Sequence, residues 1–257
     1  MYRDTPRSIP RRSCYNSSRR RHTEPYPDPA RVVASGKRLG FELTLAGDDK
    51  DMLSFDIAGG GSFIVALMPV RHPDVPKMAV GPTSPSVEEA TAANAHFIVT
   101  PLGLEGDARE RDKRMAALTA TVIENTDAVG AMLGHGVVFH KAKLFAEVAA
   151  VALEEPMLPA EIAVDVTAAR ESEERMSFLT HGLARYGREE LYVTCPIRGR
   201  SALGFVYTMA RWMLNDPDKQ LPTGETVGRT AEEKILIQRV PSPTGRGGEV
   251  IRLDLPS

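Results

Sequence analysis

The sequence lacks the features of a disulfide framework, a zinc site or a membrane span. It has two cysteines, Cys14 and Cys195, which are too few for a framework and too far apart for metal-ligand spacing. No run of apolar residues approaches the roughly 18 of a transmembrane helix, and the longest run, Phe63–Val70, has the length of a strand. The start of the chain has no apolar segment of a secretory signal. We therefore expect a cytoplasmic protein without membrane contact.

The glycine and serine motifs of common enzymes are missing as well. No Gly-x-Gly-x-x-Gly follows an expected strand, and neither Gly-x-x-x-x-Gly-Lys-Ser/Thr nor Gly-x-Ser-x-Gly occurs. The glycines at 59–61 precede an apolar strand and not a helix, which predicts a hairpin turn rather than a phosphate-binding loop, and makes Ser62 part of that strand. Cys195 lies in an apolar strand, as a small buried hydrophobe does. We expect no cofactor, and a non-enzymatic protein is favoured.

Charge is distributed unevenly along the chain. Residues 1–38 hold ten Lys/Arg and three Asp/Glu, whereas the remainder holds 22 and 31. The acidic remainder lacks the positive field that nucleic-acid binding requires. Residues 1–36, rich in Arg, Ser and Pro, are predicted to be a disordered basic tail. A basic arm for nucleic acid or an acidic membrane is one interpretation of this tail, and a dispensable extension or an early start codon is the favoured one.

Residues 37–257 are predicted to form a single α+β domain, with 37–168 and 169–257 as subdomains if it divides. Apolar residues alternate in short runs and recur at helical spacing in others. The expected strands are 39–45, 52–57, 62–70, 96–100, 127–133, 161–167, 176–179, 191–195, 234–240 and 249–253, and the expected helices begin at Ser86, Asp107, Lys141 and Ser201. These elements do not repeat as βαβ units. Mixed, mainly antiparallel sheets with helices packed on them are therefore expected.

The histidines do not have the spacing of a metal site. His135 and His140 are five residues apart and lack the glutamate of His-Glu-x-x-His. His96 and His181 lie at the ends of expected strands. Hydrogen bonds to backbone at these ends account for such positions, so no metal is expected.

Two glutamates raise the question of acid–base chemistry. Glu190 precedes a strand and Glu225 lies in a glycine turn after the next helix, so converging turns would form an acidic cleft. A hydrolase would use both glutamates with His181 and His96 in that cleft. The structural alternative is that Glu190 pairs with a basic neighbour and Glu225 caps a turn.

Several turn and strand signatures resemble a bacterial family. They are Thr180–Leu183, Tyr186-Gly187, Glu190-Leu191, Pro222–Gly228, Val65–Val70 and His96–Thr100. Together they resemble domain-of-unknown-function family 4261 over about residues 60–255. Residues 180–230 are more distantly similar to the suppressor-of-fused superfamily. This resemblance implies a protein-binding module, for example an immunity protein against a toxin. Chaperoning of a toxin or secretion effector is another possible context. The resemblance supplies no catalytic residues.

The sequence thus favours a protein that binds another protein. Its acidic body would suit a basic partner. The candidate functional surface consists of His96, His181, Tyr186, Glu190 and Glu225.

Overall fold

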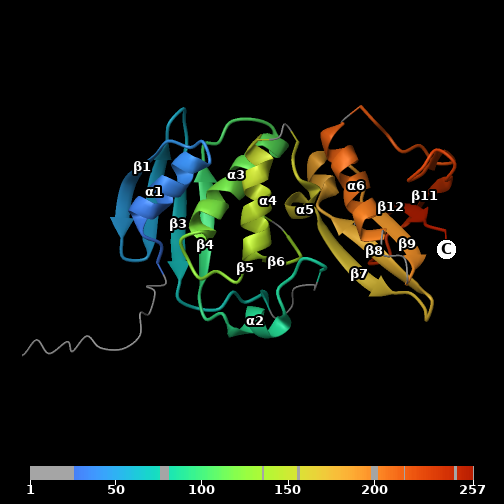
Figure 1. Cartoon of the computed structure of the whole chain (residues 1–257), viewed down its shortest axis with the longest axis horizontal. Helices are drawn as coiled ribbons and strands as arrows, with labels where there is room; N and C mark the ends of the chain where they lie inside the picture. The colour runs from blue at the N-terminus through green and yellow to red at the C-terminus, as the bar shows by residue number, and fades with distance from the viewer. Residues whose placement is uncertain are drawn as a thin grey trace, which may run out of the picture.

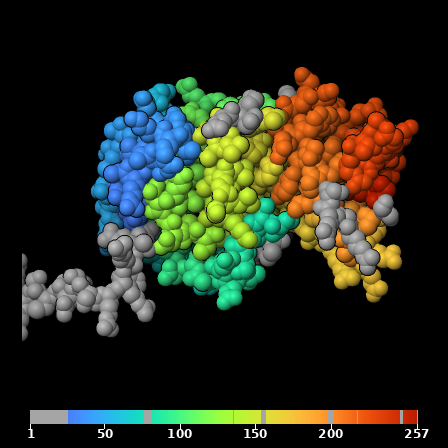
Figure 2. Space-filling model, in the orientation of Figure 1, coloured from blue at the N-terminus to red at the C-terminus, as the bar shows by residue number. Residues whose placement is uncertain are grey.

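The chain forms two β-sheets at opposite ends of the molecule, with helices α3 (Ala108–Ile123) and α4 (Ala142–Glu154) between them (Figure 1). The computed structural model describes residues 26–75, 81–134, 136–154, 157–197, 202–216, 218–245 and 248–256. The space-filling view shows an elongated body running from the N-terminal to the C-terminal sheet (Figure 2). Most strand pairs are antiparallel, which confirms the predicted α+β class.

The N-terminal sheet is a simple antiparallel meander in the order β1-β2-β3-β4. Its strands are β1 (Leu43–Asp49), β2 (Met52–Ile57), β3 (Ser62–Met68) and β4 (His96–Leu102). Alternate residues point to one face, where Phe55 and Phe63 stack with their ring centroids 4.8 Å apart. Helices α1 and α3 cover this inner face, so the first core forms between them and the sheet.

The predicted disordered tail, residues 1–36, is wrong for its last part, because residues 29–36 are helical. Helix α1 spans Pro29–Arg38, begins with the Asp28 side chain accepting from the Ala30 backbone N–H, and buries Val32 completely. Proline at the first helical position and an aspartate before it are typical helix-start residues, which the proline-rich composition obscured. Leu39 caps this helix, so the strand expected at 39–45 begins only at Leu43. Residues 1–25 lie outside the described part of the chain.

Helices α2 (Val87–Ala92) and α3 begin directly after the residues that the sequence analysis predicted as their N-caps. Ser86 and Glu89 form a capping box at α2, and Asp107 caps α3. The strand expected at 127–133 is reduced to β5 (Gly130–Ala131), which pairs with the short strand β6 (His140–Lys141). No helix in the described residues combines the length and apolar character needed to cross a bilayer.

The C-terminal sheet has six strands in the order β10-β11-β12-β9-β8-β7. The strands are β7 (Asp165–Arg170), β8 (Arg175–His181), β9 (Leu191–Pro196), β10 (Thr226–Val227), β11 (Ile235–Pro241) and β12 (Glu249–Asp254). Only β12 and β9 run parallel, and helix α6 (Ala202–Asn215) packs its apolar side on one face. Cys195 is buried in this core as expected, and burial raises the pKa of its thiol. Ser201, the expected start of the helix, lies outside the described residues.

One strand prediction was wrong at its start. Residues 161–163 belong to the short helix α5 (Ala160–Ala163), and strand β7 begins at Asp165. Ile162 and Val164 are both buried, one from the helix and one from the residue after it. Alternation over so few residues cannot separate these two conformations.

The glycine turn between β2 and β3 provides a test of this fold. Gly59 and Gly61 both have φ of 88°, and a Cβ on Gly61 would lie 2.7 Å from the Leu102 carbonyl oxygen, whereas one on Gly59 would meet nothing within 4 Å. We expect Gly59→Ala to lower the free energy of unfolding by about 1 to 2 kcal/mol through its positive φ alone. Gly61→Ala should cost at least about 1 kcal/mol more, because the backbone of β4 must also move. Urea denaturation of both variants measures the difference, and equal midpoints would contradict the described pairing of β3 with β4.

Candidate functional site

Glu190 organises the tight turn that leads into β9. The 3₁₀ turn η2 (Leu183–Tyr186) lies between Gly182 and Gly187, both with positive φ. One carboxylate oxygen of Glu190, Oε1, accepts from the backbone N–H groups of Gly182 (2.8 Å) and Ala184 (3.1 Å), and Oε2 accepts from the Thr180 hydroxyl (2.7 Å). Glu190 is therefore engaged by the turn itself, with a hydroxyl and two amides in place of the expected basic neighbour.

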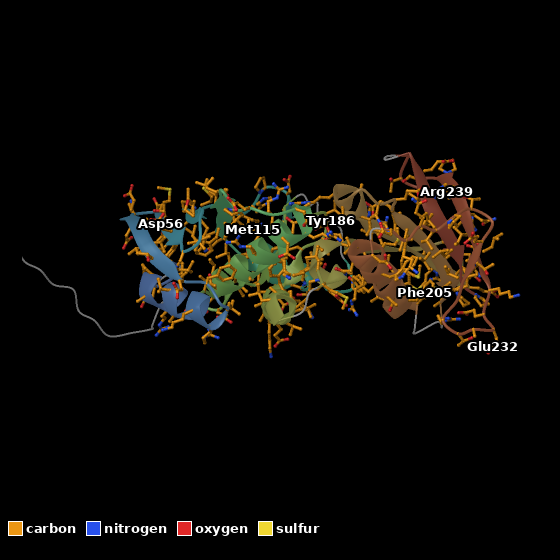
Figure 3. All side chains as sticks on the ribbon, turned by 90° about the horizontal axis from the view of Figure 1, so that it is seen from above. Asp56, Met115, Tyr186, Phe205, Glu232 and Arg239 are labelled. Carbon is orange, nitrogen blue, oxygen red and sulfur yellow. The ribbon has the colours of Figure 1, made fainter. Side chains whose placement is uncertain are left out.

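Tyr186 joins the turn to the other half of the molecule. Its hydroxyl donates to Oδ2 of Asp112 on α3 at 2.6 Å, and the Arg185 guanidinium pairs with Oδ1 of the same carboxylate. Asp112 is only 3% exposed. Burial, together with the bond to Asp112, raises the pKa of the Tyr186 hydroxyl, so this group is a donor at all physiological pH values. Figure 3 shows Tyr186 and Met115 of α3 near the middle of the molecule.

His181 ends strand β8 opposite Asp165, the first residue of β7. Its Nε2 atom lies 3.0 Å from the Thr167 hydroxyl oxygen. Burial lowers the pKa of the His181 ring, and the nearby carboxylates of Glu190 and Asp165 offset this only in part. A neutral imidazole at neutral pH follows from this balance.

His96 lies in the N-terminal sheet, whereas Glu225 lies before β10, at one edge of the C-terminal sheet that also contains β8 and β9. His96 opens β4, donates from Nδ1 to the Val70 carbonyl at 2.8 Å and packs edge-on against His72. Glu225 is exposed in the turn before β10, where its backbone carbonyl accepts from the Ile237 N–H at 2.9 Å. Both residues are thus placed by local backbone pairing.

The five sequence-derived candidates therefore do not form one site. Tyr186, Glu190 and His181 belong to one turn region beside β8 and β9, whereas His96 lies in β4 of the other sheet and Glu225 lies before β10, at the opposite edge of the C-terminal sheet from β7 (Figure 1). None of the five lines the clefts of about 770, 490 or 210 Å³. The hydrolase alternative requires four of them in one cleft, and no observation among the described residues favours it.

A buried polar chain that the sequence analysis missed lies at Asp165. This carboxylate accepts from the backbone N–H of Val137 and of Val138, and Oδ1 lies 2.9 Å from Nε2 of His140. The other ring nitrogen of His140 lies 2.7 Å from the Thr83 hydroxyl. His140 is 1% and Asp165 5% exposed. Because neither residue lines any of the three clefts, we interpret these hydrogen bonds as a structural link. Thr83, His140 and Asp165 are too far apart in the sequence for their spacing to have predicted the link.

No metal centre is found in the described residues. No three His, Cys, Asp or Glu side chains come close enough together to hold an ion. His135, one of the histidines considered above, lies outside the described part of the chain.

An apolar surface on the outer face of the N-terminal sheet was also missed. Strand pairing brings Met52, Ala66 and Ile98 into one row and Met68 and Leu102 onto the same face. We call this set, completed by Ile64 of β3, the apolar outer face. Met52, Met68, Ile98 and Leu102 are all between 38% and 48% exposed. A cluster of large exposed apolar side chains on one sheet face is typical of an interaction surface.

The charge beside the apolar outer face is negative. Asp56 points to the same side as the apolar residues, and Asp48, Asp49 and Asp51 lie at the β1–β2 turn with one lysine. Burial raises the pKa of the Tyr26 hydroxyl to about 12, and the three turn aspartates act in the same direction. This edge of the sheet therefore carries a local negative potential.

Glu190 and Glu225 form a matched pair for a stability test. We expect Glu190→Ala to lower the free energy of unfolding by roughly 3 kcal/mol, because three donors lose a charged acceptor. Glu225→Ala should change it by less than about 0.5 kcal/mol, since the side chain is exposed. Chemical denaturation of the two variants provides the measurement. Equal losses would refute the assignment of Glu190 to the turn.

The buried His181 predicts a pH dependence. Its lowered pKa in the folded chain means that the unfolded chain binds the proton more tightly. The contribution of the neutral His181 ring to the free energy of unfolding is therefore complete above about pH 6.5. Below that pH the free energy of unfolding falls by up to roughly 1.4 kcal/mol per pH unit. Urea midpoints measured from about pH 7.5 to 5.5 should fall less steeply for His181→Gln than for the wild type. Parallel curves would rule out this contribution.

Comparison of the chain with protein-family models, curated proteins and solved structures finds no match. The resemblances to family 4261 and to the suppressor-of-fused superfamily therefore stay predictions that rest on the turn signatures alone.

Proposed function

We propose that the protein is a non-enzymatic protein-binding module that uses the apolar outer face. The observation that carries this proposal is the row of Met52, Ala66 and Ile98 with its exposed apolar neighbours on a sheet face opposite the one that α1 and α3 cover. Contiguous exposed apolar side chains rimmed by polar residues are typical of protein–protein contacts.

The partner is inferred from the chemistry of that face. An apolar centre with Asp56 beside it and aspartates at the β1–β2 turn suits a partner whose apolar side chains are flanked by Lys or Arg. Two copies of the same face would bring these acids toward each other, which makes self-association the weaker alternative. A basic toxin, the class of partner that the suppressor-of-fused resemblance implies, would supply such Lys and Arg side chains.

Two of the polar residues singled out in the sequence already have hydrogen-bond partners within the chain, which is compatible with this binding mode. Glu190 and Tyr186 hold the turn and the junction with α3, and their atoms are already hydrogen-bonded. A binding module needs rigid placement of its surface and no reactive group. The placement of these residues is therefore consistent with the proposal.

Two exposed apolar side chains of nearly equal accessibility, one on each sheet, allow a controlled test of this binding surface. Ile98 is 46% exposed on the apolar outer face, and Leu236 is 48% exposed on β11 of the other sheet. The tagged chain is expressed in the organism that encodes it, and the co-purifying proteins are quantified for the wild type, Ile98→Lys and Leu236→Lys. We expect a basic partner whose recovery falls at least about tenfold with Ile98→Lys and is unchanged with Leu236→Lys.

Two outcomes would contradict the proposal. Recovery of every co-purifying protein could be the same for both variants, which would mean that the apolar outer face is not a binding surface. Alternatively, sedimentation could show that the purified chain self-associates and that Ile98→Lys abolishes this, which would replace the basic partner by a second copy.

A further inference from the structure

A cleft of about 490 Å³ lies where the two halves of the molecule meet. It is bordered by the loop after β4, the first turns of α3, the loop at 133–134 and Arg185 of η2. This volume lies within the range of about 300 to 1,000 Å³ that small-molecule sites occupy. The cleft is on a different part of the chain from the apolar outer face and is independent of the function proposed for that face.

Two guanidinium groups line this cleft against one carboxylate. Arg111 and Arg185 contribute two positive charges, and Asp112 contributes one negative charge. Arg111 is exposed and has no ion-pair partner among the described residues. The cleft therefore has excess positive charge, although residues 39–257 as a whole are acidic.

Both oxygens of the Asp112 carboxylate are already engaged by donors of the chain. Its Oδ1 accepts from Arg185 and its Oδ2 accepts from Tyr186 at 2.6 Å, and the residue is almost fully buried. Nearby acids on α3 are also engaged, since Asp107 pairs with Arg109 and Glu110 with Lys113. The charge that the cleft can still accept is therefore negative.

The position of Arg185 is fixed by its surroundings. The Nη2 atom of its guanidinium donates to Asp112. The Nη1 atom packs against Gly134, so closely that a Cβ added to this glycine would lie 2.4 Å from it. The Arg185 side chain remains 41% exposed, so part of its planar donor array faces the solvent in the cleft. A guanidinium held in this way loses little entropy on binding an oxyanion.

The remaining wall of the cleft is apolar. Pro101, Leu104, Met115 and Leu133 line it, and Met115 is seen near the middle of the molecule (Figure 3). An apolar wall opposite two guanidinium groups suits a ligand with both an anionic and an apolar part. An inorganic ion alone would leave this wall exposed to water.

We propose that this cleft binds a small organic oxyanion, a phosphate or carboxylate on an apolar body of ring size, through Arg111 and Arg185. Arg111 contributes the guanidinium that has no other described partner. Arg185 contributes the donors that Asp112 leaves available. The apolar wall selects for the body of the ligand.

The test uses the full chain with phenyl phosphate and benzoate as probes, and inorganic phosphate and phenol as comparisons. Amide chemical shifts of Gly103 and Gly134, both in the cleft wall, report binding by NMR, and calorimetry gives the Kd. We expect one of the two organic anions to shift both amides saturably and to bind more tightly than inorganic phosphate, and phenol to leave them unchanged. Which of the two probes binds distinguishes a phosphate from a carboxylate ligand.

Arg111→Gln and Arg114→Gln remove the same charge from the same helix, but Arg114 does not line the cleft. We expect Arg111→Gln to raise the Kd at least about tenfold and Arg114→Gln less than about threefold. Urea midpoints equal to the wild type confirm that both variants fold.

Three results would overturn the proposal. The amides of Gly103 and Gly134 could be unaffected by either organic anion at millimolar concentration. The two variants could weaken binding equally, which would indicate diffuse attraction to the helix. Inorganic phosphate could bind as tightly as phenyl phosphate, which would remove the role of the apolar wall.

Discussion

The arrangement of the two halves depends on two buried carboxylates that each accept donors from a different part of the chain. Asp165 takes two backbone N–H groups of the segment before α4 and contacts the ring of His140. Asp112 takes the side chains of Arg185 and Tyr186. A buried carboxylate without such donors costs several kcal/mol, whereas one with all its donors fixes the geometry of every group around it. These two carboxylates thereby tie β7 and η2 of the C-terminal half to the segment before α4 and to α3.

Local signals predicted the elements well where a single residue type determines a helix start or a turn. Asp107 and Ser86 cap their helices, and the glycines at 59–61 form the hairpin, because hydrogen bonding and positive φ act within a few residues. The start of α1 was obscured by the proline-rich tail. The start of β7 was misplaced because two alternating apolar residues fit a strand and a short helix equally well.

The candidate site was less predictable, because its contacts join residues that are far apart in sequence. Tyr186 and Asp112 are 74 residues apart, and Asp165 and His140 are 25 apart. Asp112 did carry one usable signal: it lies three and four positions before Met115 and Ala116, on the side of α3 that turns inward. A carboxylate at such a position requires a partner from elsewhere, but the helix pattern does not say which one. The apolar outer face was hidden for the opposite reason, since alternation with apolar residues on both faces resembles a fully buried strand.

The electrostatic field of the molecule constrains how an anion would reach the cleft. The whole chain carries a formal net charge of −2, so no long-range positive field draws an anion toward the molecule. Its affinity must then come from short-range contacts with the guanidinium groups of Arg111 and Arg185 inside the cleft. A site of this kind discriminates by the fit of the whole ligand, since charge alone does not concentrate ligands near it. In the functions proposed above, the aspartates beside the apolar outer face would favour a basic protein, so the two surfaces would prefer ligands of opposite charge.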